Sequence, residues 1–126
     1  MNKIIKKIHM GDLTHIRSDI AIDIKNGKMG KRQLQKIILK LKNDEVGREL
    51  FVNNIVFQIN NDKSMWTDDY LRNIGEAISC GDLSEELLYH MLDVSRYVNR
   101  AYRYVGFVCI IVIMLLVVVV INKVRR

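Results

Sequence analysis

The dominant hydrophobic feature of the chain is an uninterrupted apolar run near its C-terminal end, from Val105 to Ile121. The run contains 17 residues, and none of them is charged. A helix of that length extends roughly 25 Å, and Tyr104, Lys123 and Arg125 at its ends can reach the interfaces of a hydrocarbon core about 30 Å thick. We therefore predict a transmembrane helix at 105–121, followed by a short basic tail at 122–126.

The residues before this run continue the same helical pattern. Apolar side chains recur at alternating intervals of four and three residues, at Leu87, Met91, Val94, Val98 and Ala101. We call these five residues the apolar stripe, and they predict either a helix-association face or packing on the chain's own bundle. Asp82 and Glu85 have the spacing of a capping box, with Asp82 as the N-cap. We therefore predict one helix from about Leu83 to Asn122, roughly 60 Å long.

The chain before residue 83 contains no proline, and apolar residues recur in it at helical spacing. We predict a first helix that has Asp12 as its N-cap and ends before the turn at Asn26–Gly30. Isoleucines also stand at every second position in part of 18–25, which is typical of a β-strand. No good partner strand follows them, so we favour a helix there.

Three more helices are expected before the long one. The first has four apolar residues on one face: Leu34, Ile37, Ile38 and Leu41. The second extends from about Asp44 to Ile59 and has the broadest apolar set, so we expect it to be the most buried, although 51–59 also suits a strand. The third faces the core with three residues and ends at Gly81: Leu71, Ile74 and Ile78.

The fold class that follows is all-α. We predict a small N-terminal bundle of about four to five helices, whose last helix continues into a single C-terminal transmembrane helix. In this division 1–82 is a cytosolic helical domain and 83–104 is the juxtamembrane part of the long helix.

Length and composition limit the classes of protein to which the chain can belong. It has 126 residues, a net charge of +6 and 49% hydrophobic residues, which suits one small domain. Residues 1–42 contain 11 basic and 3 acidic side chains, whereas 43–104 contain 6 and 11. The basic segment can attract the acidic one within the fold, or it can face an anionic partner. Two cysteines are too few for a disulfide-stabilised scaffold.

The residues that most often carry chemistry form no catalytic or metal-binding pattern. The three histidines lack the spacing of metal ligands, and neither cysteine belongs to a Cys–His motif. Gly27–Arg32 has too few residues between its glycines for a phosphate-binding loop. Trp66 and Tyr70, four residues apart, predict a satellite core or a small contact patch. We therefore expect no catalytic residue, no metal, no cofactor and no small-molecule substrate.

Two groups of basic residues are the candidate binding residues. One occupies positions i, i+4 and i+7 just before the apolar run, and it consists of Arg96, Arg100 and Arg103. The other surrounds the turn after the first helix, and it consists of Lys28, Lys31 and Arg32. Both suit the lipid bilayer, through anionic headgroups, or an acidic protein partner, and both also suit ordinary solvated faces. Few aromatic residues accompany them, so nucleic acid is not an expected partner.

The predicted layout supports three hypotheses about function. The first is a tail-anchored, non-enzymatic interaction, adaptor or assembly module on a cytoplasmic membrane face, because no signal peptide precedes the domain. Its membrane would be the inner membrane of a bacterium, or the endoplasmic reticulum or outer mitochondrial membrane for a eukaryotic or viral protein. The second is a membrane-active effector or regulator, holin-like or apoptosis-regulator-like. The third is a membrane-tethered nucleic-acid binder.

The same layout is similar to that of Bcl-2 relatives, which also place a helical domain before a C-terminal anchor. Gly47–Phe51 contains some residue types of their Asn-Trp-Gly-Arg element, but in a different order. The resemblance is therefore one of architecture, and it implies no site residue in this chain.

Overall fold

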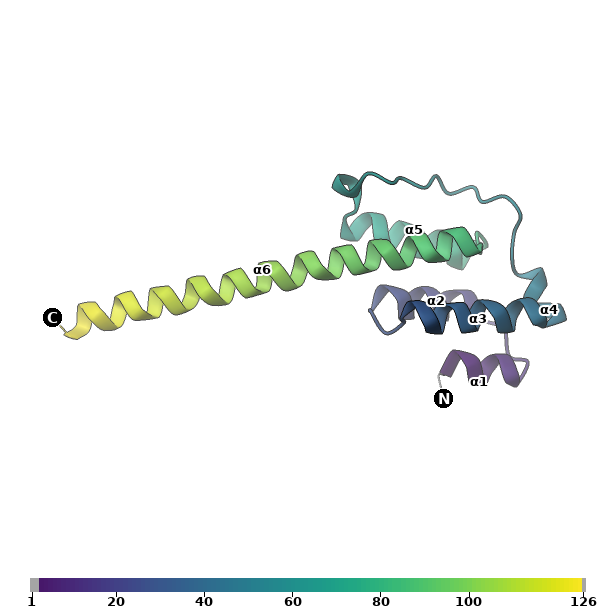
Figure 1. The fold of residues 1–126 in the computed structure, drawn as a ribbon, viewed down its shortest axis with the longest axis horizontal. Helices are drawn as coiled ribbons and strands as arrows, with labels where there is room; N and C mark the ends of the chain where they lie inside the picture. Colours follow the sequence, from purple (N-terminus) through teal and green to yellow (C-terminus); the bar gives the residue numbers. More distant parts are fainter. Residues whose placement is uncertain (1–2, 126) are drawn as a thin grey trace.

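The structure is a computed structural model that describes residues 3–125, and over that range it is all-α. It contains six α-helices, one short 3-10 turn and no strand, as predicted for the fold class (Figure 1). In chain order the elements are α1 (Lys3–His9), α2 (Ile16–Lys25), α3 (Lys31–Asn43), α4 (Glu45–Glu49), η1 (Lys63–Met65), α5 (Asp68–Cys80) and α6 (Glu85–Arg125).

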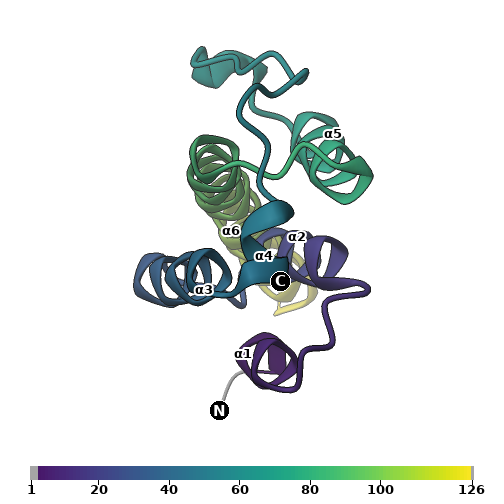
Figure 2. The same cartoon turned by 90° about the vertical axis from the view of Figure 1, so that its right-hand side faces the viewer.

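The bundle is built in three layers around the first part of α6. Viewed along the bundle, α5 and α6 form one layer, α2 and α3 form the next, and α1 lies beneath them (Figure 2). α2 packs against both α5 and α6, whereas α1 contacts α2 and α3. The core between the layers consists of aliphatic side chains with no exposed surface, among them Ile20, Ile24, Leu34, Ile37, Leu41, Ile74, Ile78, Leu83 and Leu87.

The pattern of burial in α2 confirms the helix that we favoured for 18–25. Ile16, Ile20 and Ile24 are at most 1% exposed, whereas Ile22 is 54% exposed. A strand would place Ile20, Ile22 and Ile24 on one face, because its side chains alternate between two faces. The spacing of four residues that is buried here belongs to one face of a helix.

The start of α2 differs from our prediction, and a helix before it was missed. α1 buries Ile4, Ile5 and Ile8 on one face, a spacing that the sequence does contain. Gly11, with φ of 71°, ends this helix, and the Asp12 amide donates a hydrogen bond to the Lys7 carbonyl at 3.0 Å. Asp12 is not an N-cap, because α2 begins only at Ile16 and His15 occupies its N-cap position.

The long third helix predicted from Asp44 to Ile59 was wrong. Only α4 forms, capped by the Asp44 carboxylate, which accepts hydrogen bonds from the Val46 and Gly47 amides at 2.9 and 3.0 Å. Residues 50–62 then cross the bundle as an extended segment without regular structure, which we call the strap (Figure 1). The segment is neither the most buried part of the chain nor a strand, since Val56 is 85% exposed.

Hydrogen bonds to neighbouring elements explain why the strap is extended. The Val56 and Phe57 amides donate to one Asp82 carboxylate oxygen at 3.2 and 3.0 Å, and the Val52 amide donates to the Leu83 carbonyl at 2.9 Å. Asp82 is therefore not the N-cap of α6. The Ser84 hydroxyl caps that helix instead, because it accepts a hydrogen bond from the Leu87 amide at 3.1 Å.

The single long helix predicted for 83–122 is confirmed as α6, which extends from Glu85 to Arg125 and is roughly 60 Å long. One face of α6 is buried in the bundle up to Val98, and the side chains that the structure describes from Arg100 to Arg125 are exposed. α6 is long and apolar enough to cross a membrane by length and composition, and none of its most apolar window is buried. It is thus a candidate for a single membrane-spanning helix. The last residue of the predicted tail, Arg126, lies outside the described residues.

The two isoleucines of α2 provide a matched test of this packing. Ile20→Ala should lower the free energy of unfolding by about 2–5 kcal/mol, because it leaves a cavity in the core. Ile22→Ala should change it by less than about 1 kcal/mol, since that side chain is exposed. Urea unfolding in detergent micelles, followed through the fluorescence of Trp66, measures both losses. Equal losses would contradict the helical burial pattern.

Candidate functional site

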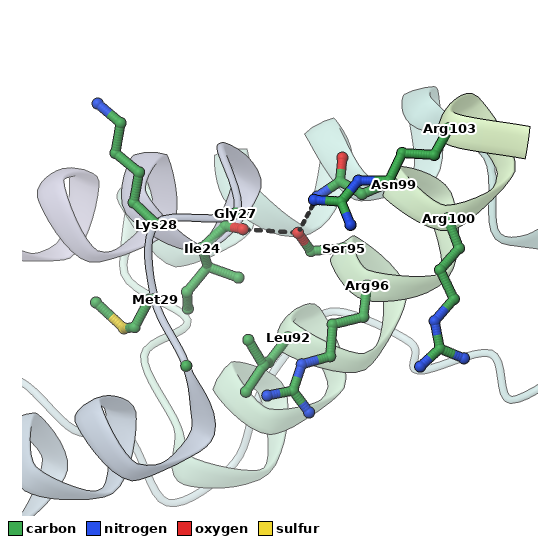
Figure 3. A pocket seen from close by; sticks show the side chains of 11 residues that line it. Ile24, Gly27, Lys28, Met29, Leu92, Ser95, Arg96, Asn99, Arg100 and Arg103 are labelled. Carbon is green, nitrogen blue, oxygen red and sulfur yellow. Dashed lines mark hydrogen bonds between the residues drawn. The ribbon is translucent and has the colours of Figure 1, made fainter. Parts of the chain in front are cut away.

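The turn between α2 and α3 is fixed directly to α6. The hydroxyl of Ser95, which is 1% exposed, donates a hydrogen bond to the Ile24 carbonyl at 2.6 Å. The Asn99 side-chain amide donates in turn to the Ser95 hydroxyl at 3.3 Å (Figure 3). These bonds satisfy a carbonyl at the end of α2, and they place residues 27–30 beside the last buried turns of α6.

A pocket of about 410 Å³ lies between this turn and α6. Its walls include Met29 and Leu92, and it contains no acidic side chain. Four cationic side chains line it, and we call it the basic pocket after them: Lys28, Arg96, Arg100 and Arg103. Lys28 comes from the turn and the three arginines come from α6, so two groups of basic residues that are distant in the sequence meet here.

Among the described residues no carboxylate lines the basic pocket itself, although Asp93 lines a neighbouring hollow together with Arg96 and Arg100. The ion pairs found in the described part of the chain are Lys7–Asp19, Lys42–Glu85 and Arg72–Asp69, and none involves a residue of the pocket. Figure 3 shows the Arg103 side chain extending back along α6 toward Asn99, whereas Lys28 and Arg100 point outward in different directions. These long side chains are free to reorient toward an anion.

The remaining predicted binding residues lie outside the basic pocket. Lys31 and Arg32 are exposed in the first turn of α3. Lys31 lines an adjacent hollow, which it shares with Arg96 and with the carboxylates of Glu85 and Asp93. Of the six basic residues predicted to bind lipid or a partner, four therefore surround one space and a fifth stands at its edge.

The apolar stripe is largely buried inside the domain. Leu87, Met91 and Val94 have no exposed surface and Val98 is 5% exposed, whereas Ala101 is exposed. The stripe therefore packs on the chain's own bundle, which was the second of the two alternatives. Association of two chains through its first four residues would require the bundle to open.

A second cluster joins the strap, η1, α5 and α6. The Tyr70 hydroxyl and the His90 Nε2 atom are hydrogen-bonded at 2.7 Å, and the Trp66 indole donates to the Asn60 carbonyl at 2.7 Å. Trp66 also meets the rings of His90 and Tyr97 edge to face, with centroids 5.5 and 5.6 Å apart. The satellite core predicted around Trp66 and Tyr70 thus includes His90, a role that its isolated position in the sequence did not indicate.

The surroundings of His90 favour its neutral form. The residue is 8% exposed, and burial lowers its pKa below the ordinary value of 6.5. The nearby carboxylates of Asp93 and Glu86 oppose this shift but do not reverse it. In the described part of the chain no three His, Cys, Asp or Glu side chains are grouped so that they could hold a metal ion. The geometry of His90 is that of a packing residue.

The chemistry that the basic pocket offers is anion binding. Guanidinium groups present several N–H donors to phosphate or carboxylate oxygens, and an ammonium group adds a further charge. Among the described residues that line it, Ser95 carries a hydroxyl, which is already hydrogen-bonded to Ile24 and Asn99. No protein-family model, curated protein or solved structure matches this chain. The site is therefore argued from its own geometry.

The lowered pKa of His90 predicts how stability depends on pH. Between pH 6.5 and the lower folded pKa, the unfolded chain binds a proton at His90 that the folded chain does not, so stability should fall as the pH falls across this interval. Above that range His90 contributes no pH dependence. Urea unfolding between pH 7.5 and 5 should show a smaller decline for His90→Gln than for the natural chain. Parallel pH curves would contradict the prediction.

Two glycines with the same backbone conformation test the contact between the turn and α6. Gly27 and Gly11 both have φ of 71°, but only at Gly27 would a Cβ atom meet another residue, the Asn99 amide nitrogen at 3.3 Å. Gly11→Ala should lower the free energy of unfolding by about 1 kcal/mol through backbone strain, and Gly27→Ala by about 2 kcal/mol. Urea unfolding gives both values. Equal losses would mean that the turn does not press on Asn99.

Proposed function

We propose that this protein is a non-enzymatic, single-pass membrane protein that holds a helical interaction module against the cytoplasmic face of a membrane. The observation that carries the proposal is the continuity of α6. One helix packs in the bundle up to Val98 and then extends out of it (Figure 1), and this outer part is apolar enough to cross a membrane.

The distance between the two parts of α6 is short. Val98, the last core residue, precedes Val105 by seven positions, which corresponds to about 10 Å of helix. No break in the helix separates them. A flexible linker would let the domain move away from the bilayer, but a continuous helix keeps it near the surface in one orientation. This arrangement suits a protein that presents a defined face at a membrane.

The basic residues next to the apolar run are almost evenly divided between its two sides. Arg96, Arg100 and Arg103 precede the run, and Lys123, Arg125 and Arg126 follow it. In the fold Lys28 adds a fourth cation beside the three arginines. Cytoplasmic flanks of membrane helices carry the excess of Lys and Arg, so the difference of one charge favours a cytoplasmic domain.

The exposed lysines of α1 and α3 support the role of an interaction module. Residues 1–42 carry 11 of the basic side chains, and exposed lysines of these two helices such as Lys3, Lys6 and Lys36 belong to this set. An acidic protein surface is the complementary partner. α1 lies at the bottom of the bundle and α3 at one side of the layer above it, so a partner can reach both helices without disturbing the core (Figure 2).

The two cysteines make the anchor and its orientation testable. Cys80 lies at the exposed end of α5, whereas Cys109 lies within the apolar run. The chain should stay in the membrane pellet at alkaline pH. In intact cells an impermeant maleimide should leave Cys80 unlabelled in a Cys109→Ser variant, and permeabilisation should expose it. In the matched Cys80→Ser variant, Cys109 should react only after detergent is added.

Two results would contradict this assignment. Release of the chain by alkaline carbonate would remove the anchor, and labelling of Cys80 from outside intact cells would reverse the orientation. Crosslinking through the exposed lysines in native membranes tests the interaction role. Crosslinking of a distinct protein to α1 or α3 supports the role of an adaptor. A ladder of self-adducts would instead indicate that the protein forms a homo-oligomer.

A further inference from the structure

The basic pocket lies at the level where α6 leaves the bundle. Arg103 and Arg100 precede Val105 by two and five residues, which corresponds to about 3 and 8 Å along the helix, and Arg96 stands about 14 Å away. The polar layer of a bilayer is about 5–8 Å thick on each side of the hydrocarbon core. Two of the three arginines therefore fall at headgroup depth and the third lies just above it.

The opposite wall of the pocket is built before any ligand arrives. The bond from the Ser95 hydroxyl to the Ile24 carbonyl fixes the turn that carries Lys28. Gly30, at the end of this turn, is the N-cap position of α3 and provides no side chain to cap the first amides. The positive end of the 13-residue α3 helix dipole therefore adds to the field of the four cations.

We propose that the basic pocket binds the phosphate headgroup of an anionic phospholipid in the leaflet next to the domain. This inference rests on the proposed function, because it requires α6 to be inserted from about Val105. Guanidinium groups pair with phosphate through two parallel hydrogen bonds, and the lining contains no carboxylate that would repel the anion.

The surface below the pocket favours a lipid over a soluble phosphate. Arg103 is followed, after Tyr104, by the exposed apolar side of α6, including Val105, Phe107 and Val108. A phosphate held by Arg100 and Arg103 leaves its acyl chains beside these residues, so one molecule satisfies both the cationic pocket and the apolar helix. A free phosphate would leave that second surface unused.

The inference can be tested with the full chain in phosphatidylcholine nanodiscs that contain a minor fraction of phosphatidic acid. Native mass spectrometry after release should show phosphatidic acid retained in preference to phosphatidylcholine. The double variant Lys28→Gln/Arg100→Gln should lower this preference by about twenty-five-fold, because each cation near a charged leaflet contributes about fivefold. Both side chains are exposed, and Trp66 fluorescence verifies that the variant is folded.

The matched control removes the same charge from exposed positions on α1 and α3 that do not line the basic pocket. Lys6→Gln/Lys36→Gln should keep the preference for phosphatidic acid. An equal loss in this control would overturn the proposal, because it would mean that the lipid is attracted by the overall positive charge and not by the pocket. Displacement of the retained lipid by equimolar inorganic phosphate would overturn the proposal that the pocket binds a lipid, and would assign the pocket to a soluble anion. Failure of the chain to insert into the nanodisc would reject the proposed function itself, whereas insertion without a lipid preference rejects only this inference.

Discussion

The structure depends on the continuity of α6 through two different environments. Up to Val98 its apolar face is covered by α2, α3 and α5, and the burial of aliphatic side chains there stabilises the bundle. From Val105 to Ile121 the side chains of α6 are exposed, and none of them is charged. Water would penalise that surface strongly, whereas a hydrocarbon layer would not. The apolar part of α6 therefore requires a hydrocarbon environment, and the unbroken helix determines the orientation of the bundle relative to that environment.

The parts of the fold that could be predicted from the sequence are those in which one helix face provides the whole signal. The sets around Leu34 and Leu71 and the run from Leu87 into the apolar segment have regular spacing, and the structure buries them accordingly. In α2 the sequence pattern was compatible with both a strand and a helix, because Ile20, Ile22 and Ile24 alternate. Packing decides for the helix, in which α2 contacts both α5 and α6.

The strap could not be predicted because its conformation is decided by residues elsewhere in the chain. Ile55, Phe57 and Ile59 are half-buried and alternate with exposed neighbours, which is the pattern of an extended segment. An extended chain needs partners for its amides, and a side chain rather than a strand supplies two of them, the Asp82 carboxylate. The same carboxylate is an acceptable N-cap in the sequence, so local spacing alone assigned it to the wrong helix terminus.

The basic pocket shows the same dependence on tertiary structure at the candidate site. The glycine spacing of Gly27–Arg32 excludes a phosphate-binding loop formed by this segment alone. In the fold the loop lies opposite three arginines from a helix more than sixty residues away in the sequence. Like charges at i, i+3 and i, i+4 on a helix destabilise it by about 0.2–0.5 kcal/mol per pair. Asp93, three residues before Arg96, offsets part of that repulsion, but no carboxylate among the described residues lines the pocket itself. An anion that enters the pocket therefore relieves the repulsion that remains.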